Sequence, residues 1–298
     1  MSTESSQNQS VANDVWTVRQ ILEWTTAHLQ KHGSDSARLD AEILLAHARQ
    51  CQRIDLYTRY NDILSDNDRT AMRELVQRRA NAEPVAYLVG HREFFSLEFH
   101  VTPHVLIPRP DTETLVIELL ELIKPIAHPS VLDLCTGSGC IAIASAVNSP
   151  QAKVTATDLS KEALAIAAKN SQQHSMQNSI QFYQGDLFKA LPTGSSYDLI
   201  VSNPPYVRED EYLTLADDIL QHEPRLALVS GADGLDCIRS VINNAPQYLT
   251  SGGHLLIEFS PEQATAVASL MKENGAYKNI TLIKDLSGKE RAIKAITL

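Results

Sequence analysis

The sequence predicts an α/β protein in which a small helical domain precedes a larger domain built on a mostly parallel β-sheet with an antiparallel C-terminal edge. From residue 130 onward, apolar runs of strand length alternate with segments of helical periodicity. This alternation is typical of a parallel sheet with right-handed crossovers. Before residue 84 the apolar residues recur mainly at helical spacing. A chain of 298 residues is long enough for two such domains.

Four segments are expected along the chain. Residues 1–14 are polar and predict a disordered tail, and residues 15–84 predict the helical domain. Residues 85–110 are expected to form a hairpin and a proline-rich linker, because aromatic residues alternate there before two prolines. Residues 111–298 form the predicted sheet domain.

The strands and helices of the sheet domain can be placed from apolar runs and turn residues. The strands expected to be parallel are 130–134, 153–157, 180–184, 197–202 and 253–259. Helices are expected at 140–148 and 161–174. Two further strands, 278–284 and 292–297, joined by a tight turn at Gly288, predict the antiparallel edge.

Composition and charge exclude several functions. The chain has 26 Lys and Arg against 36 Asp and Glu, a net charge of −10. Because nucleic-acid binding depends on basic residues that neutralise phosphates, no direct nucleic-acid binding is expected. The four cysteines form no Cys-x-x-Cys pair, so we expect no metal site and read them as reduced thiols of a cytoplasmic protein. No secretory signal and no apolar run of ~20 residues is evident, so no membrane association is expected.

The first chemical motif is a glycine-rich turn, Cys135-Thr136-Gly137-Ser138-Gly139, directly after the strand at 130–134. Glycines let a ligand approach the backbone, and the start of the following helix offers free N–H groups. Asp158, about 20 residues later at the end of the next strand, fits an acidic residue that holds ribose hydroxyls. The same layout serves dinucleotides and S-adenosylmethionine, so both remain open at this point.

The most specific motif is Asn203-Pro204-Pro205-Tyr206, directly after the strand at 197–202. The side-chain carbonyl of Asn203 and the main-chain carbonyl of Pro204 can each accept one hydrogen bond from an –NH2 group. The two prolines stiffen the loop, and Tyr206 offers a flat wall for a planar group. This arrangement suits methyl transfer to an amino or amide nitrogen, with catalysis by positioning and without a metal. Asn203, Pro204 and Tyr206 are the catalytic candidates, and Pro205 joins them in substrate binding.

A third motif, Gly185-Asp186-Leu187-Phe188, follows the strand at 180–184. Asp186 can accept a hydrogen bond from the amino group of an adenine, while Leu187 and Phe188 pack on the ring. A capped turn without a binding role is the alternative.

In this order, the motifs resemble those of class I S-adenosylmethionine-dependent methyltransferases, which have a Rossmann-like domain. More narrowly, the chain resembles the HemK-type protein-(glutamine-N5) methyltransferases of class I peptide chain release factors. The narrower resemblance covers about residues 15–298. The segments that carry it are EPVAYLVG (83–90), REFF (92–95), IPRPDTE (107–113), HEP (222–224) and KDLSGKER (284–291).

The resemblance implies methyl transfer from S-adenosylmethionine to the side-chain amide nitrogen (N5) of the glutamine in the Gly-Gly-Gln motif of a release factor. It implies that Asn203 binds this amide with help from Pro204, Pro205 and Tyr206, and that the helical domain docks another part of the factor. The implied cofactor residues are Cys135, Thr136, Gly137, Ser138, Gly139, Asp158, Asp186, Leu187 and Asn203.

Two positions depart from the family pattern, and other functions stay open. Cys135 stands where a glycine is common, and Leu187 where a larger aromatic residue can occur. Residues 134–144, 222–224 and 233–235 also resemble the enzymes that methylate a glutamine of ribosomal protein L3, the nearest alternative. An adenine-N6 nucleic-acid methyltransferase shares the Asn-Pro-Pro-Tyr loop, and a nicotinamide dehydrogenase shares the glycine turn. A non-enzymatic cofactor-binding regulator is the remaining alternative.

Overall fold

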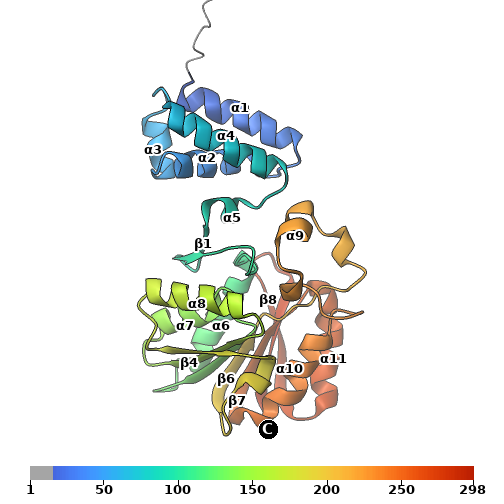
Figure 1. The fold of residues 1–298 in the computed structure, drawn as a ribbon. Helices are drawn as coiled ribbons and strands as arrows, with labels where there is room; N and C mark the ends of the chain where they lie inside the picture. The colour runs from blue at the N-terminus through green and yellow to red at the C-terminus, as the bar shows by residue number, and fades with distance from the viewer. Residues whose placement is uncertain (1–15) are drawn as a thin grey trace, which may run out of the picture. The chain divides into compact units, whose positions relative to one another are not determined.

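The computed structural model describes residues 16–298, so the tail predicted at residues 1–14 lies outside the described residues. The chain divides into two compact units, with the division between Val89 and Gly90 (Figure 1). A domain boundary after residue 84 was expected instead. The difference arises because α5 (Val85–Val89) is a short helix whose Leu88 is buried in the core of the helical unit.

The helical unit packs α5 with four other helices, which are α1 (Val18–Lys31), α2 (Ala37–Ala48), α3 (Arg53–Thr58) and α4 (Asp66–Ala80). Capping boxes start α1 at Thr17 and α4 at Ser65, since each hydroxyl accepts a hydrogen bond from a first-turn N–H. Leu22, Leu44 and Met72 belong to the core between these helices. Periodicity predicted α1, α2 and α4, whereas α3 has too few residues for a helical period to stand out.

The second unit contains a seven-stranded sheet in the order β5-β4-β3-β6-β7-β9-β8. Its strands are β3 (Ser130–Leu134), β4 (Lys153–Asp158), β5 (Ile180–Gln184), β6 (Tyr197–Ser202), β7 (Leu249–Glu258), β8 (Tyr277–Lys284) and β9 (Glu290–Thr297). β3 to β7 are parallel, and β9 pairs antiparallel with both β7 and β8. The predicted α/β fold with an antiparallel edge is confirmed.

One strand boundary differs clearly from the prediction. β7 begins at Leu249, not at residue 253, because the strand continues through Gly252 and Gly253 with a register shift opposite Tyr197–Leu199. Glycine inside a strand is commonly such an irregularity and not a strand end.

Helices cover both faces of the sheet (Figure 1). One core lies between the sheet and the helices α6 (Glu113–Ile123) and α7 (Cys140–Asn148), with α8 (Lys161–Gln173) on the same side. A second core lies beneath α10 (Asp236–Asn244) and α11 (Ala264–Asn274). Because both faces are covered, the central strands β3 and β6 are largely apolar, with a few buried polar residues such as Asp133 and Ser202.

The predicted hairpin consists of β1 (His91–Phe94) and β2 (Leu97–His100). Its turn residues Phe95 and Ser96 have φ values of 51° and 58°, the left-handed conformation of a type I′ turn. Asn170 of α8 connects β2 to the glycine-rich turn. Its Nδ2 donates to the carbonyls of His100 at 3.0 Å and Ser138 at 2.9 Å.

A short helix, α9 (Asp217–His222), lies in the long connection between β6 and α10. No helix within residues 16–298 combines the length and the apolar character needed to cross a membrane. The connection matters for the site, because it carries residues that face the ends of β3 and β6.

Candidate active site

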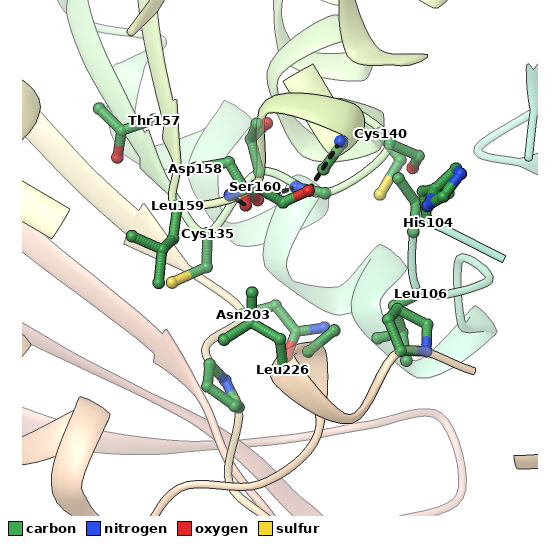
Figure 2. A pocket seen from close by; sticks show the side chains of 18 of the residues that line it. His104, Leu106, Cys135, Cys140, Thr157, Asp158, Leu159, Ser160, Asn203 and Leu226 are labelled. Carbon is green, nitrogen blue, oxygen red and sulfur yellow. Dashed lines mark hydrogen bonds between the residues drawn. The ribbon is translucent and has the colours of Figure 1, made fainter. Parts of the chain in front are cut away.

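A cavity of about 250 Å³ lies at the carboxyl ends of the parallel strands, where open α/β sheets bind ligands (Figure 2). Each neighbouring strand supplies a residue to its wall: Cys135 follows β3, Asp158 ends β4, Gly185 follows β5 and Asn203 follows β6. The sheet thus brings together motifs that are far apart in sequence.

Most of the predicted site residues line this cavity, and three do not. Those in the wall are Cys135, Thr136, Gly137, Ser138, Asp158, Asp186, Leu187, Asn203 and Pro205. Gly139, Pro204 and Tyr206 lie outside the wall. Gly139 has φ = 81° and lies against α8, where an added Cβ would come within 3.1 Å of Ala167. Its contribution is therefore close packing of the turn.

The glycine-rich turn is tied to Asp158. The carboxylate accepts hydrogen bonds from the backbone N–H of Gly137 at 2.8 Å and from that of Ser160 at 2.9 Å. Burial raises the pKa of Asp158 above its ordinary value. An added Cβ on Gly137 would meet no atom within 4 Å, so there is free space directly over the turn. These features form a cradle beside a carboxylate.

A second buried carboxyl, Asp133, supports the same turn from below. It accepts hydrogen bonds from the hydroxyl of Thr136 at 2.6 Å and from the N–H of Ala142 at 3.2 Å. Burial raises its pKa to about 7. The sequence reasoning did not single out Asp133, because an Asp in an apolar strand gives no indication of its partners.

The Asn203 side chain has a defined orientation. Its Nδ2 donates to Oγ1 of Thr112 at 3.0 Å, and Thr112 is 2% exposed. The two polar atoms of an amide point in different directions, so Oδ1 points away from Thr112 while Asn203 lines the cavity. The residue is therefore held as a hydrogen-bond acceptor toward an incoming ligand.

The flat wall expected from Tyr206 is not observed. Its ring packs against the core beneath α10 and α11, and its hydroxyl donates to Oε1 of Glu258 at 3.5 Å. Its main-chain carbonyl accepts from Nε2 of Gln263 at 2.9 Å. Tyr206 thus anchors the loop from behind the cavity. Pro204 is buried in the same loop.

Two segments that the sequence singled out meet beside the cavity. Arg109 and Glu223 form an ion pair with Nη2 and Oε1 at 2.5 Å, and the Ile107 N–H donates to the other carboxylate oxygen at 3.2 Å. The Glu223 side chain is 2% exposed. Pro224 and Leu226, which follow Glu223 in the chain, also line the cavity. Sequence patterns cannot pair such residues, since they are 114 positions apart.

The C-terminal KDLSGKER segment reaches the same region through Arg291. Its guanidinium contacts Asp111 at 2.9 Å and Asp285 at 3.3 Å. The Ser287 hydroxyl, the main-chain N–H groups of Ser287 and Lys289, and Arg291 donate to Asp285 and lower the pKa of its carboxyl to about 2. This ion-pair network holds the start of the IPRPDTE segment.

The third predicted motif is placed only in part as expected. Asp186 and Leu187 line the cavity, and Asp186 also pairs with Lys189 at 2.7 Å. Phe188 does not reach the cavity, so the prediction that it packs on a bound ring is wrong. It is buried and stacks on Tyr248 with ring centroids 4.7 Å apart. Leu187, between these two positions, has φ = 49°, a conformation that is rare for a leucine.

Three of the cysteines also line the cavity: Cys135, Cys140 and Cys237. Cys135 has φ = 61°, which accounts for glycine being common at this position. A hydrogen bond with Cys237, together with burial, raises the pKa of Cys135 well above its ordinary value. Burial raises the pKa of Cys140 to about 12, so this thiol is a poor nucleophile. Within residues 16–298 no three His, Cys, Asp or Glu side chains are arranged to hold a metal ion.

Comparison with known proteins decides the family. Residues 20–90 match the family model "PrmC N-terminal domain", and residues 110–233 match "Methyltransferase small domain". A release factor glutamine methyltransferase of Rhodopirellula baltica is 48% identical over 95% of this chain and 97% of its own length. One from Geobacter sulfurreducens is 40% identical over 94% and 96%. The chain belongs to the release factor glutamine methyltransferase family. The resemblance stated for the motifs is thereby confirmed.

Solved structures agree with this family at the level of the fold. The catalytic domain of hMettl16, determined in complex with MAT2A 3'UTR hairpin 6, aligns with a TM-score of 0.56 at 15% identity. The alignment covers 73% of this chain and 82% of that one. The cavity of this family member therefore lies in a methyltransferase fold. The relatives favour methylation of a release factor over the alternatives that the sequence left open.

Proposed function

We propose that this chain transfers a methyl group from S-adenosylmethionine to the side-chain amide nitrogen (N5) of a glutamine in a class I peptide chain release factor, namely the glutamine of its Gly-Gly-Gln motif. One observation carries the proposal: Asn203 is held as an acceptor by Thr112 in the same cavity as the cradle formed by Gly137 and Asp158. The named substrate of the relatives supports the choice of protein.

The residues at the cavity fit this methyl donor. Free space over Gly137 would accommodate the amino-acid part, and the Asp158 carboxylate would accept hydrogen bonds from ribose hydroxyls. Asp186 and Leu187 also line the cavity and would flank the adenine. When bound, S-adenosylmethionine supplies a methyl group that its sulfonium has already activated, and no metal is required for this chemistry.

The chain contributes positioning. An amide nitrogen is a poor nucleophile because its lone pair is delocalised into the carbonyl. Oδ1 of Asn203 accepts one amide hydrogen, and the carbonyl of Pro204, the next residue of the loop, is proposed to accept the other, so the nitrogen is directed toward the methyl group. As the N–CH3 bond forms, the S–CH3 bond breaks and leaves S-adenosylhomocysteine, and the nitrogen gives up one of its two hydrogens as a proton to solvent. Tyr206 acts indirectly by anchoring the loop. Arg109, which pairs with Glu223, and Leu226 line one side of the cavity and would restrict the access of water there.

The helical unit is proposed to dock the protein substrate. A cavity of about 500 Å³ lies between α1 and α4, and its lining includes Trp24, Met72 and Val76 beside Arg73. Trp24 is 48% exposed, which is unusual for so large an apolar side chain and typical of contact surfaces. The expected cytoplasmic location and the absence of direct nucleic-acid binding stay predictions.

A methyl-transfer assay tests the proposal. The purified protein is incubated with labelled S-adenosylmethionine and, separately, with a release factor, ribosomal protein L3 and plasmid DNA. We expect label on the release-factor glutamine, located by peptide mass spectrometry, and no label when that glutamine is replaced. Label on L3 alone would retain the mechanism and change the substrate, whereas label on DNA would refute the proposal.

A further inference from the structure

Behind the wall of the cavity, a row of buried groups leads to Asn203. Its first member is Thr112, which accepts the Asn203 amide at 3.0 Å. The second is Glu258, whose carboxyl accepts from the hydroxyl of Tyr206 at 3.5 Å and lies near enough to the Thr112 hydroxyl for that group to lower the Glu258 pKa. Thr112 is 2% exposed and Glu258 is 1% exposed, so water does not compete for these bonds.

The direction of each hydrogen bond follows from the number of protons. The hydroxyl of Thr112 has one hydrogen, and its oxygen already accepts from Asn203. That hydrogen therefore points away from Asn203, and the nearby Glu258 carboxyl is an acceptor available to it. An ionised carboxylate only accepts, so it holds Thr112 with its lone pair toward Asn203. Without this constraint the Asn203 amide could rotate and present its –NH2 group to the cavity.

An ionised carboxyl at the buried position of Glu258 is energetically unfavourable. Burial raises its pKa to about 7, and its Oε2 has no hydrogen-bond partner among the described residues. The charged groups that face it are Arg291 of β9, which favours the ionised form, and Asp111, which opposes it. A buried, incompletely paired carboxyl reduces stability, so a contribution to stability does not account for it.

We propose that Thr112 and Glu258 are positioning residues for methyl transfer: Glu258 orients the Thr112 hydroxyl, and Thr112 holds Asn203 with Oδ1 toward the substrate amide. The assignment rests on the proposed function, since it gives the Asn203 amide a direction that matters only if an –NH2 group binds there.

Three substitutions, each compared with the wild type, test whether Thr112 orients Asn203. Thr112→Val removes the hydroxyl at nearly constant volume, and Thr112→Ser retains it. Thr297→Val is the matched control, because Thr297 is also a buried threonine. It is the last residue of β9, whereas Arg291, which faces Glu258, is near the start of that strand. We expect Thr112→Val to lower kcat about 10- to 100-fold. Thr112→Ser should restore most of the rate, and the Kd for S-adenosylhomocysteine should stay within about twofold.

A pH profile separates positioning from simple structural support. Protonated Glu258 becomes a donor and competes for the Thr112 oxygen, so kcat should fall as the pH drops below about 7. In Glu258→Gln, this fall in kcat at low pH should be absent. Asp133→Asn should keep it, although Asp133 is the other buried carboxyl near the cavity whose pKa is raised to about 7.

An activity-independent measurement completes the design. The side-chain NH2 signals of Asn203 in a 1H–15N spectrum, assigned with Asn203→Asp, should shift in Thr112→Val and stay unchanged in Thr297→Val. Unchanged signals in Thr112→Val, or equal kcat losses in Thr112→Val and Thr112→Ser, would overturn the inference. A wild-type protein that methylates no glutamine, with the Asn203 signals still shifted in Thr112→Val, would refute the proposed function and leave the orienting contact supported.

Discussion

Replacing Asn203 by Ala is the sharpest test of the amide-binding mechanism. The substitution removes Oδ1, the acceptor in the cavity wall, and the 3.0 Å hydrogen bond to Thr112. Removing one preorganised polar group from a catalytic site typically costs about 10²- to 10³-fold in kcat, or ~2.7–4 kcal/mol. Loss of the hydrogen bond to Thr112 should lower the free energy of unfolding by about 1 kcal/mol. The rate effect should therefore far exceed the stability effect.

The assay compares single-turnover methyl transfer with cofactor affinity. The cradle at Gly137 and Asp158 is unchanged in Asn203→Ala, so the Kd for S-adenosylhomocysteine by calorimetry should change by less than about threefold. Asn244→Ala is the matched control, because Asn244 also donates one side-chain hydrogen bond, to the Ser240 carbonyl at 2.7 Å, and lies outside the cavity wall. A rate for Asn203→Ala within threefold of the wild type would refute the amide-binding mechanism.

Three further predictions concern the cradle, the loop and the buried carboxyl. Asp158→Ala should weaken cofactor binding at least about tenfold, since it removes a ribose acceptor and the bond that holds Gly137; unchanged affinity by calorimetry would contradict this role. Gly234→Ala should lower kcat and thermal stability, because Gly234 has φ = 75° and an added Cβ would lie 2.3 Å from the Tyr206 carbonyl. A variant with wild-type Tm and rate would show that the loop can move away freely. Asp133 should make stability pH-dependent: its folded pKa of about 7 exceeds its unfolded value, so its stabilising contribution is complete below about pH 4 and is lost as the pH rises through 7. Relative to Asp133→Asn, the free energy of unfolding of the wild type should fall by about 1.4 kcal/mol per pH unit in this window, measured by urea unfolding at pH 5, 6 and 7. A difference independent of pH would contradict this account.

Much of the site could be predicted from sequence because its backbone geometry is local. The glycine-rich turn requires left-handed conformations at Gly137 and Gly139, and the loop after β6 requires two prolines. Each motif directly follows an apolar strand, and parallel strands end at one edge of a sheet. Cys135, Asp158, Asp186 and Asn203 were therefore expected to share one cavity, and they do.

The directions of the aromatic side chains could not be predicted in this way. Tyr206 and Phe188 both follow polar site residues, yet both turn into the core beneath the sheet. Phe188 stacks on Tyr248 and follows Leu187, which has a left-handed conformation, and Tyr206 is held by Glu258 and Gln263. Neither a rare conformation at a leucine nor a distant partner has a signature in the local sequence.

Local patterns in the sequence were enough to predict the succession of the sheet strands along the chain, the edge of the sheet that binds a ligand, and the kind of nitrogen that suits the Asn-Pro-Pro-Tyr loop. The tertiary structure alone decided which partners orient the functional groups. Thr112 lies 91 positions from Asn203, and Glu258 lies 52 positions from Tyr206. Hydrogen bonds over such separations depend on sheet register and helix packing, which many weak apolar contacts across the chain set together.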